Sequence, residues 1–282
     1  MRFGCCPGLA SFVPPTLDGQ EDSLSVAHAA QCARIPEILC VIETAGYDYV
    51  EFGVGTTVPE QPEADFQRFR DALVGSRLRA EVFSSFVPPW IKLVGPEVDW
   101  ARVEEYLRLA TERVARAGGD CIIFGSGGAR LRPEGWPAGE AETQLARFIN
   151  LAADYCEVHG ILLCIEPLNA TETNMINRVA DGAEWVRRIG RANVRVLADC
   201  FHMSMEGEPF ENIVAAADRL GHVHVADRER RYPAAFGYDI DGFFAALKRA
   251  GYDGRVSVEA NFDDFAMEAP AGLARIRQAA SV

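Results

Sequence analysis

Four short apolar runs of this chain each end in a side chain that binds metal ions well. These side chains belong to Glu166, Asp199, His224 and Glu259, in the segments GILLCIEPLN, VRVLADCFHM, LGHVHVAD and GRVSVEANF. Three carboxylates and one imidazole form a ligand set that suits a hard or borderline divalent cation such as Mn²⁺, Mg²⁺ or Co²⁺. The four residues therefore predict a metal-dependent reaction centre.

Glu166 and Glu259 also predict proton transfer. One carboxylate of such a pair can remove a proton from carbon while the other returns a proton on the opposite face. A bound cation keeps both carboxylates ionised and limits their mutual repulsion. The alternative for Glu166 alone is a structural ion pair with an arginine inside the fold, because a buried carboxylate needs a partner.

Polar residues that follow the same runs are expected near a substrate. His202 follows Asp199 in a D-x-x-H pattern and could bind a metal-held water or a substrate oxygen, although a helix cap or a packed histidine fits the pattern too. In HVHVADRERR we place Arg230 at the substrate and interpret the neighbouring charges as a solvated loop. Glu172 is polar and close enough in sequence to Glu166 to reach a ligand.

Two histidines, His222 and His224, alternate on one run. Side chains two residues apart on a strand face the same side, so both point into the fold or both point out. His224 lies nearer the end of the run and is the predicted ligand, whereas His222 is interpreted as a satisfied core residue. The second nitrogen of a metal-bound histidine needs an acceptor, which the sequence does not identify.

The elements that must position these residues alternate along the chain. Short apolar runs predict buried strands at residues 2–6, 49–53, 79–83, 121–124, 161–165, 194–198, 221–225 and 255–258. Apolar residues at helical spacing predict helices at 36–45, 64–74, 99–117, 140–159, 180–189, 210–219, 240–250 and 267–279. This alternation predicts a single α/β domain over residues 1–282, a (β/α)₈ TIM barrel.

Chemistry in such a barrel takes place at the carboxyl ends of the strands. The four predicted ligands occupy those ends on the last four strands, and Glu51, which closes YDYVEFG, occupies the same place on the second. A doubly wound open sheet is the competing fold, but GCCPG after the first strand lacks its glycine fingerprint.

Two features of the strand-end loops allow more than one interpretation. The segment FGSGGAR, residues 124–130, could bind a phosphate through its backbone amides, and Arg130 is consistent with a phosphorylated substrate. The alternative is that the glycines only allow a tight loop. Loop aromatics could form an apolar wall of a binding pocket or simply pack. These are Phe12, Phe86, Trp90, Phe124 and Trp136.

Composition argues against several classes of protein. The 282 residues are 49% hydrophobic and carry a net charge of −13, so we expect no nucleic-acid partner and no anionic membrane partner. No run is long enough to span a bilayer and no secretory segment follows Met1, which predicts a cytoplasmic protein. The eight cysteines form no C-x-x-C pair, so we expect neither disulfides nor a cysteine metal site.

The combination of IEPLN, DCFHM, GHVHVAD and GYDGRVSVE resembles the xylose-isomerase-like barrel superfamily. It is closest to the branch of sugar isomerases and epimerases that contains ketose 3-epimerases, and the resemblance covers nearly the whole chain. In two places the chain departs from that branch. Ala226 and Asp227 stand where the branch often has Gly-Glu, and CCPGLASFVPP lacks recognisable substrate-binding residues, which leaves the sugar open.

This resemblance implies roles for seven residues. It makes Glu166, Asp199, His224 and Glu259 the ligands of one divalent ion. Mn²⁺ is the expected ion, and Mg²⁺, Co²⁺ and Zn²⁺ are the alternatives. The resemblance also makes Glu166 and Glu259 the acid/base pair, and Glu172, His202 and Arg230 the substrate contacts.

The expected activity is a metal-dependent sugar isomerase or ketose epimerase in carbohydrate metabolism. It would act on a small sugar or polyol-ketone through an enediolate that the metal stabilises, and a homodimer or homotetramer is expected at the level of the family. The main alternative is an inosose dehydratase-like lyase. An endonuclease IV-like hydrolase would need more than the five histidines present, and a non-catalytic sugar binder is a further alternative.

Overall fold

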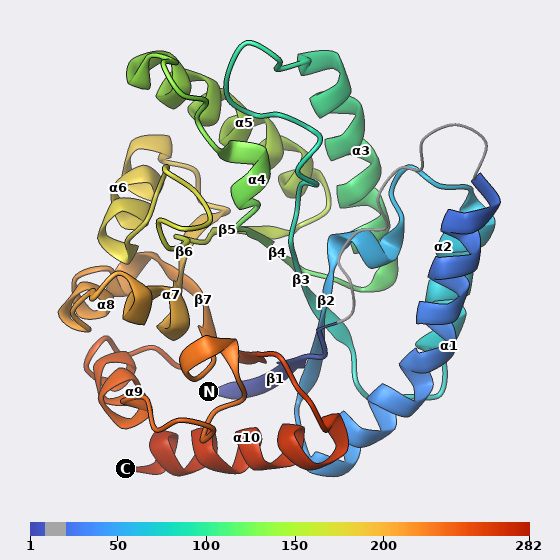
Figure 1. The fold of residues 1–282 in the computed structure, drawn as a ribbon, viewed down its shortest axis with the longest axis vertical. Coiled ribbons are helices and arrows are strands. Elements are labelled where there is room, and N and C mark those ends of the chain that lie inside the picture. The colour runs from blue at the N-terminus through green and yellow to red at the C-terminus, as the bar shows by residue number, and fades with distance from the viewer. Residues whose placement is uncertain (9–20) are drawn as a thin grey trace.

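The computed structural model describes residues 1–8 and 21–282, and a barrel of parallel strands forms its centre (Figure 1). The strands pair in chain order, and β8 pairs with β1 to close the barrel. They are β1 (Arg2–Cys6), β2 (Tyr49–Gly53), β3 (Ala80–Ser84), β4 (Cys121–Phe124), β5 (Leu162–Ile165), β6 (Val194–Asp199), β7 (Leu220–Val225) and β8 (Arg255–Glu259). The predicted (β/α)₈ barrel is confirmed.

Helices surround the strands on all sides (Figure 1). The outer helices are α1 (Glu21–Ala45), α2 (Glu63–Ala72), α3 (Trp100–Ala117), α5 (Ala138–Val158), α6 (Val179–Ile189), α8 (Glu211–Ala215), α9 (Ile240–Arg249) and α10 (Phe265–Ser281). Shorter helical turns are η1 (Val54–Thr57), α4 (Gly127–Arg130), α7 (Cys200–Met205), η2 (Ala217–Arg219) and η3 (Arg228–Arg230). Within residues 1–8 and 21–282, none of the helices combines the length and apolar character needed to cross a membrane.

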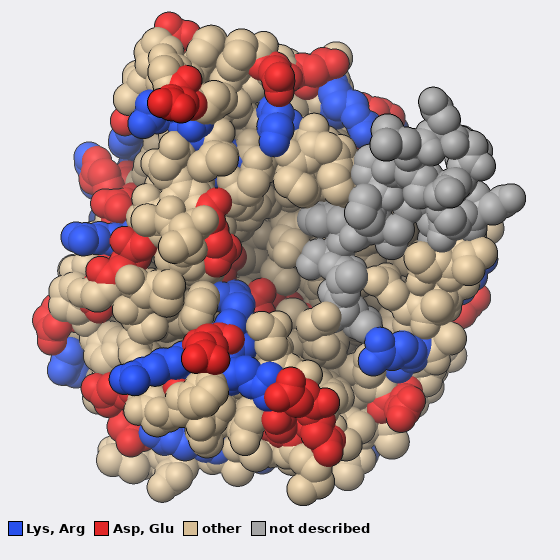
Figure 2. All heavy atoms as spheres, viewed as in Figure 1, with Lys and Arg blue, Asp and Glu red and all other residues tan. Residues whose placement is uncertain are grey.

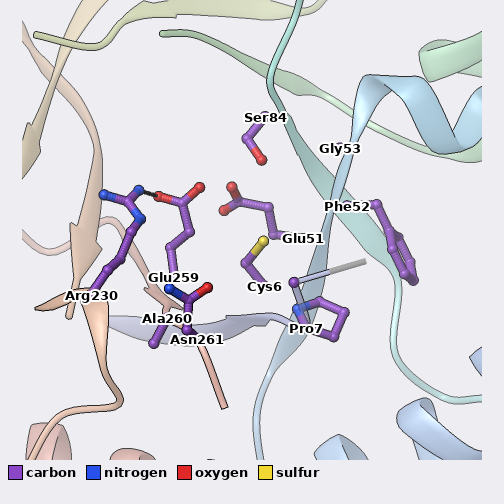
Figure 3. Close-up of a pocket in the computed structure, with 11 residues that line it drawn as sticks. Cys6, Pro7, Glu51, Phe52, Gly53, Ser84, Arg230, Glu259, Ala260 and Asn261 are labelled. Carbon is purple, nitrogen blue, oxygen red and sulfur yellow. Dashed lines mark hydrogen bonds and ion pairs between the residues drawn. The ribbon is translucent and has the colours of Figure 1, made fainter. Parts of the chain in front are cut away.

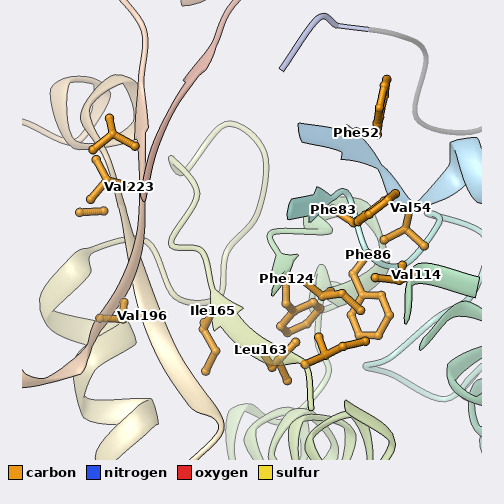
Figure 4. Close-up of a cluster of buried hydrophobic side chains, with 14 of the residues drawn as sticks. Phe52, Val54, Phe83, Phe86, Val114, Phe124, Leu163, Ile165, Val196 and Val223 are labelled. Carbon is orange, nitrogen blue, oxygen red and sulfur yellow. The ribbon is translucent and has the colours of Figure 1, made fainter. Parts of the chain in front are cut away.

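Alternation along each strand directs side chains into two layers. Ile122 and Phe124 of β4 point outward and pack against the helices, in the layer of which Figure 4 shows a part. Cys121 and Ile123 point inward instead. They belong to a small inner cluster with Tyr49, Val82, Cys164 and Leu197. Tyr49 can fill the barrel because a Cβ atom on residue 4, a glycine, would lie 2.1 Å from its ring.

Helix α3 forms where its sequence predicts a helix. The Asp99 side chain accepts hydrogen bonds from two backbone N–H groups of the first turn, at 3.0 and 3.2 Å. Gly118 ends the helix in the left-handed conformation, with φ of 98°. The stripe that it buries comprises Val103, Leu107, Ala110 and Val114.

Two helix predictions are wrong at their boundaries. We expected a helix at 36–45, but α1 begins at Glu21 and continues through Pro36. An interior proline costs about 3 kcal/mol, and burial of Ile35, Leu39 and Ile42 on either side offsets this cost. The helix expected at 210–219 divides into α8 and η2, because the backbone of Ala216 is not helical.

Candidate active site

The carboxyl ends of the strands form one face of the molecule, which is hollowed near its centre (Figure 2). A pocket of about 260 Å³ on this face is lined by five of the predicted site residues, Glu166, Glu172, His202, Arg230 and Glu259. The other two, Asp199 and His224, are buried against them. The structure therefore brings all seven predicted residues together.

His224 lies at the centre of the predicted ligands. Its Nδ1 atom is 2.9 Å from Glu259 Oε2, 3.1 Å from Glu166 Oε1 and 3.9 Å from Asp199 Oδ2. One donor atom from each of the four residues lies within 4.8 Å of the others. Because the residues end four neighbouring strands on the inward side, one ion can reach all four.

Asp199 uses its two carboxylate oxygens differently. Oδ1 accepts a hydrogen bond from the backbone N–H of Phe201 at 2.8 Å, which caps α7. Oδ2 is buried and accepts no hydrogen bond, although Arg230 Nη2 lies 3.3 Å away. A buried carboxylate oxygen without a donor is costly, so Oδ2 is an atom that a cation would satisfy.

Arg230 is the basic side chain that approaches these carboxylates in the part of the chain that the structure describes. Its Nη2 pairs with Glu259 and its guanidinium lies 5.0 Å from the ring centroid of Phe201. Burial lowers the pKa of Arg230, but Glu259 and Asp199 outweigh burial and raise this pKa above its usual value. Both Glu229 and Arg230 have positive φ, 57° and 54°, a conformation that non-glycine residues disfavour.

Asp227 anchors the loop that carries Arg230. Its buried carboxylate accepts hydrogen bonds of 2.7–3.1 Å from backbone N–H groups at residue 228 and at residues 236 to 238. Burial raises the pKa of Asp227, but these hydrogen bonds outweigh burial and lower it. The interpretation as a solvated loop is confirmed for the exposed Arg228 and Glu229. It is wrong for Arg231, which pairs with Glu268 at 3.1 Å.

The pKa values of Glu166 and Glu259 are shifted in opposite directions. Burial raises the pKa of Glu166, and the negative charge of Glu259 adds to this increase. Burial also raises the pKa of Glu259, but Arg230 and His224 outweigh it and bring this pKa to about 2. Paired groups whose environments separate their pKa values are typical of an acid and a base.

His202 is oriented by Asn169. The backbone N–H of Asn169 donates to His202 Nδ1 at 3.1 Å, which places the ring proton on Nε2. That Nε2 atom lies 3.7 Å from Asp199 Oδ2 and 3.2 Å from Arg230 Nη1. The Asn169 amide also donates to Glu172 Oε1 at 2.9 Å. His202 and Glu172 thus reach the pocket in fixed orientations.

Glu51 is a residue of the site to which the sequence analysis assigns no role. This fully buried carboxylate lies 3.1 Å from His224 Nε2 through Oε1 and 3.3 Å from His222 Nε2 through Oε2. Burial raises the pKa of Glu51, but the two histidines outweigh burial and hold it well below its usual value. The signal was present in the sequence, because Glu51 is the carboxylate near the end of the apolar segment YDYVEFG, although β2 continues for two residues beyond it.

The interpretation of His222 as a satisfied core residue is only partly correct. His222 is fully buried, and its Nε2 atom lies 3.1 Å from Ser257 Oγ. Its Nδ1 atom has no hydrogen-bond partner. Burial lowers the pKa of His222 to about 4, so the ring is neutral at pH 7.

A second pocket of about 200 Å³ adjoins the first and shares Arg230 and Glu259 with it. Glu51, Cys6 and Glu259 direct their polar atoms toward its centre (Figure 3). The two pockets together form the space next to the predicted metal ligands.

Arg130 does not support the interpretation of residues 124–130 as a phosphate site. It is fully buried and donates to the backbone carbonyls of Phe124 and Glu166 at 3.2 and 2.8 Å. Burial lowers its pKa to about 10. The glycines have a packing reason as well, since a Cβ atom at Gly125 would lie 2.3 Å from Glu166 Oε2. Arg130 therefore links the carboxyl ends of β4 and β5.

The aromatic residues divide between packing and surface positions. Phe86 and Phe124 pack against Phe148 in the outer layer, with ring centroids 6.2 and 4.8 Å apart, so neither forms a pocket wall. Trp136 is half-buried and donates to a glutamine oxygen at 3.2 Å, whereas Trp90 is 38% exposed. Phe12 lies outside the described residues. The eight cysteines form no disulfide.

The donors of the site fit a divalent cation. Three carboxylates from Glu166, Asp199 and Glu259 meet the side chain of Arg230 and the imidazole of His224. Their negative charge exceeds the charge of one guanidinium, and Asp199 Oδ2 has no hydrogen bond. An ion held by oxygen and nitrogen donors would neutralise the excess.

Comparison with known proteins finds ketose 3-epimerases. The chain is 28% identical over 216 residues to the L-ribulose 3-epimerase of Methylomonas sp. (strain DH-1), which covers 76% of this chain and 74% of that protein. It is 37% identical over 112 residues to the D-psicose 3-epimerase of Agrobacterium fabrum and 31% identical over 159 residues to the ketose 3-epimerase of Arthrobacter globiformis. These two alignments cover 39% and 55% of this chain, and 39% and 54% of the relatives.

Solved structures share the whole fold. The D-allulose 3-epimerase from Methylomonas sp. superposes with a TM-score of 0.80 at 23% identity, over 99% of this chain and 98% of that one. A D-psicose 3-epimerase determined in the presence of D-fructose gives 0.80 at 20% identity, over 100% of both chains. The family described as "Xylose isomerase-like TIM barrel" matches residues 41–279. The expected resemblance is thus confirmed, and the chain belongs to the xylose isomerase-like TIM barrel family.

Proposed function

We propose that this chain is a divalent-metal-dependent ketose epimerase that acts on a small sugar or polyol-ketone. The observation that carries the proposal is the convergence of three carboxylates on His224 Nδ1, in a chain whose relatives are named ketose 3-epimerases. Glu166, Asp199, His224 and Glu259 would hold the ion, with Mn²⁺ preferred. When bound, such an ion supplies a Lewis acid for the substrate's oxygens.

Glu259 and Glu166 are the proposed base and acid. Arg230 keeps Glu259 ionised, so Glu259 can accept the proton from the carbon next to the carbonyl. Burial favours the protonated form of Glu166, which can return a proton to the opposite face. Reaction in the reverse direction exchanges the two roles.

Glu172, His202 and Arg230 are the proposed substrate contacts. All three line the pocket that Glu166 and Glu259 also line. His202 Nε2–H and the Arg230 guanidinium can donate to substrate oxygens, and the Glu172 carboxylate can accept from a hydroxyl. Fixing the substrate in this way contributes to rate because the reacting carbon is held between the two carboxylates.

Solvent exchange tests the proposal directly. Ketoses such as D-fructose and L-ribulose are incubated in D₂O with Mn²⁺-loaded protein, and NMR and mass spectrometry follow the sugar. We expect an epimer that carries deuterium next to the carbonyl, and no label with chelator-treated protein. Loss of water from the product would favour the dehydratase instead. Absence of label from every ketose and inosose tried would favour a sugar binder.

A further inference from the structure

We propose that Glu51 is the positioning residue that holds His224 in its metal-binding tautomer and so sets the affinity of the site for a divalent cation. This inference rests on the proposed function, because it assumes that His224 binds the ion. Glu51 lies on β2, two residues before the end of that strand, whereas the four proposed ligands lie at the carboxyl ends of β5 to β8. It therefore acts from the opposite side of the barrel.

Glu51 contacts His224 on the nitrogen that faces away from the other ligands. His224 Nε2 lies 3.1 Å from Glu51 Oε1 and 3.3 Å from Oε2, while Nδ1 faces Glu166 and Glu259. Both side chains are fully buried, and Glu51 also lines the second pocket. A buried carboxylate on the second nitrogen is the arrangement that orients a histidine ligand and increases its basicity.

The contact determines which nitrogen of His224 carries the proton. A carboxylate accepts hydrogen bonds only, so the proton lies on Nε2 and points at Glu51. Glu259 and Glu166 lie 2.9 and 3.1 Å from Nδ1, so this nitrogen faces carboxylates as well. An ion bound among those carboxylates takes the place of a proton on Nδ1, while Glu51 keeps the proton of Nε2. The contact with Glu51 therefore makes Nδ1 the nitrogen that binds the cation.

A chain of buried polar side chains holds Glu51 in place. His222 Nε2 lies 3.3 Å from Glu51 Oε2 and 3.1 Å from Ser257 Oγ, and Ser257 Oγ lies 3.0 Å from the hydroxyl of Tyr49. These side chains lie inside the barrel, where neighbouring strands fix them. In the described residues, the contacts found for the Glu51 carboxylate are with His222 and His224 rather than with arginine or lysine. Its charge is thus directed to the histidines.

Mn²⁺ titration of folded variants tests this role. We expect Glu51→Ala to weaken Mn²⁺ affinity about 10- to 100-fold and Glu51→Gln to weaken it by a smaller factor of roughly 3 to 10, because an amide oxygen can still accept from Nε2–H. The matched control is Glu81→Gln, which changes another buried barrel carboxylate that contacts Arg2 and Arg255 instead. Its Mn²⁺ affinity should equal that of the wild type.

Histidine ¹⁵N NMR of the protein loaded with diamagnetic Mg²⁺ gives a second readout. We expect the wild type to show the His224 proton on Nε2 with Nδ1 bound to the ion, and Glu51→Ala to lose this tautomer pattern. Wild-type affinity and an unchanged tautomer in Glu51→Ala would overturn the role of Glu51. If Glu51→Ala does not fold, the same two results in Glu51→Gln decide against it. Failure of the wild type itself to bind Mn²⁺ would instead overturn the proposed function and this inference with it.

Discussion

The two ends of the barrel both bury carboxylates, but they neutralise them differently. At the amino ends of the strands, Glu81 lies 2.7 Å from Arg2 and 3.3 Å from Arg255, and Arg255 also pairs with Asp120. At the carboxyl ends, carboxylates converge on His224 and Arg230, and a buried oxygen of Asp199 lacks a hydrogen bond. The two amino-end carboxylates named here are paired with arginines, whereas Asp199 Oδ2 at the carboxyl end is an acceptor that a cation would satisfy.

Because of this difference, the carboxylates at the amino end contribute to stability and those at the carboxyl end contribute to chemistry. A carboxylate paired with arginine satisfies its buried charge, which stabilises the fold without creating reactivity. Carboxylates left without a full set of donors raise the energy of the folded protein and bind ions or protons readily. We therefore expect changes at the two ends to have opposite consequences.

The largest effect is expected at the carboxyl end, for Glu259→Gln. The amide keeps an oxygen ligand but cannot take a proton from carbon, so turnover should fall about 10²- to 10⁴-fold with Mn²⁺ affinity nearly unchanged. Steady-state kinetics and Mn²⁺ titration on the same preparation check this prediction. Near-normal turnover would show that Glu259 is not the base.

The next effect concerns pH and His222. Its folded pKa of about 4 lies below the unfolded value near 6.5, so the unfolded chain binds a proton that the folded chain excludes. The stability from neutral His222 is present above pH 6.5 and is lost as pH falls from 6.5 to 4, in total roughly 3 kcal/mol. Urea unfolding of metal-free protein should show this loss in the wild type, and a smaller loss in His222→Asn. Equal pH dependence would mean that His222 titrates normally.

Metal binding should neutralise carboxylates at the carboxyl end and so make the two ends of the barrel more alike in charge balance. An ion that binds only the folded state stabilises it by about 2.7 kcal/mol at a concentration of 100 times its Kd. Thermal unfolding with and without Mn²⁺ measures this increase, which should be absent in Asp199→Ala. An unchanged Tm of the wild type across a Mn²⁺ series would contradict the metal site.

The smallest effect is expected at the amino end, for Glu81→Gln. Loss of the charge weakens the contacts with Arg2 and Arg255 and should reduce the free energy of unfolding by about 1–3 kcal/mol. Because this position is remote from both pockets, kcat and KM should stay at wild-type values. A large loss of turnover in folded Glu81→Gln would contradict the division of roles between the two ends.

Local pattern was enough to predict most strands. Strands β1, β2 and β4 have the predicted limits, because each is an apolar run bounded by turn residues. The predicted metal ligands at the carboxyl ends of β5 to β8 could be identified for the same reason. A polar residue that closes an apolar run marks the carboxyl end of a parallel strand. Asp199, His224 and Glu259 all stand there.

Residues that meet across the barrel were not predictable in this way. Glu51 and His224 are far apart in the sequence and stand on β2 and β7, which are not neighbours. Arg130 resembles a loop cation, yet its guanidinium lies against the backbone carbonyls of Phe124 and Glu166. Periodicity shows which face of a strand a side chain occupies, but the partner on the far wall depends on how the barrel closes.

The local pattern of apolar and polar residues was therefore sufficient to predict the alternation of strands and helices, the barrel and the four inward ligands. These features depend on the polarity of residues that are close together in the sequence. Closure of the sheet placed Glu51 behind His224, directed Arg230 onto Glu259 and buried Arg130. Those contacts join residues that are distant along the chain, and their geometry depends on strand stagger and loop conformation.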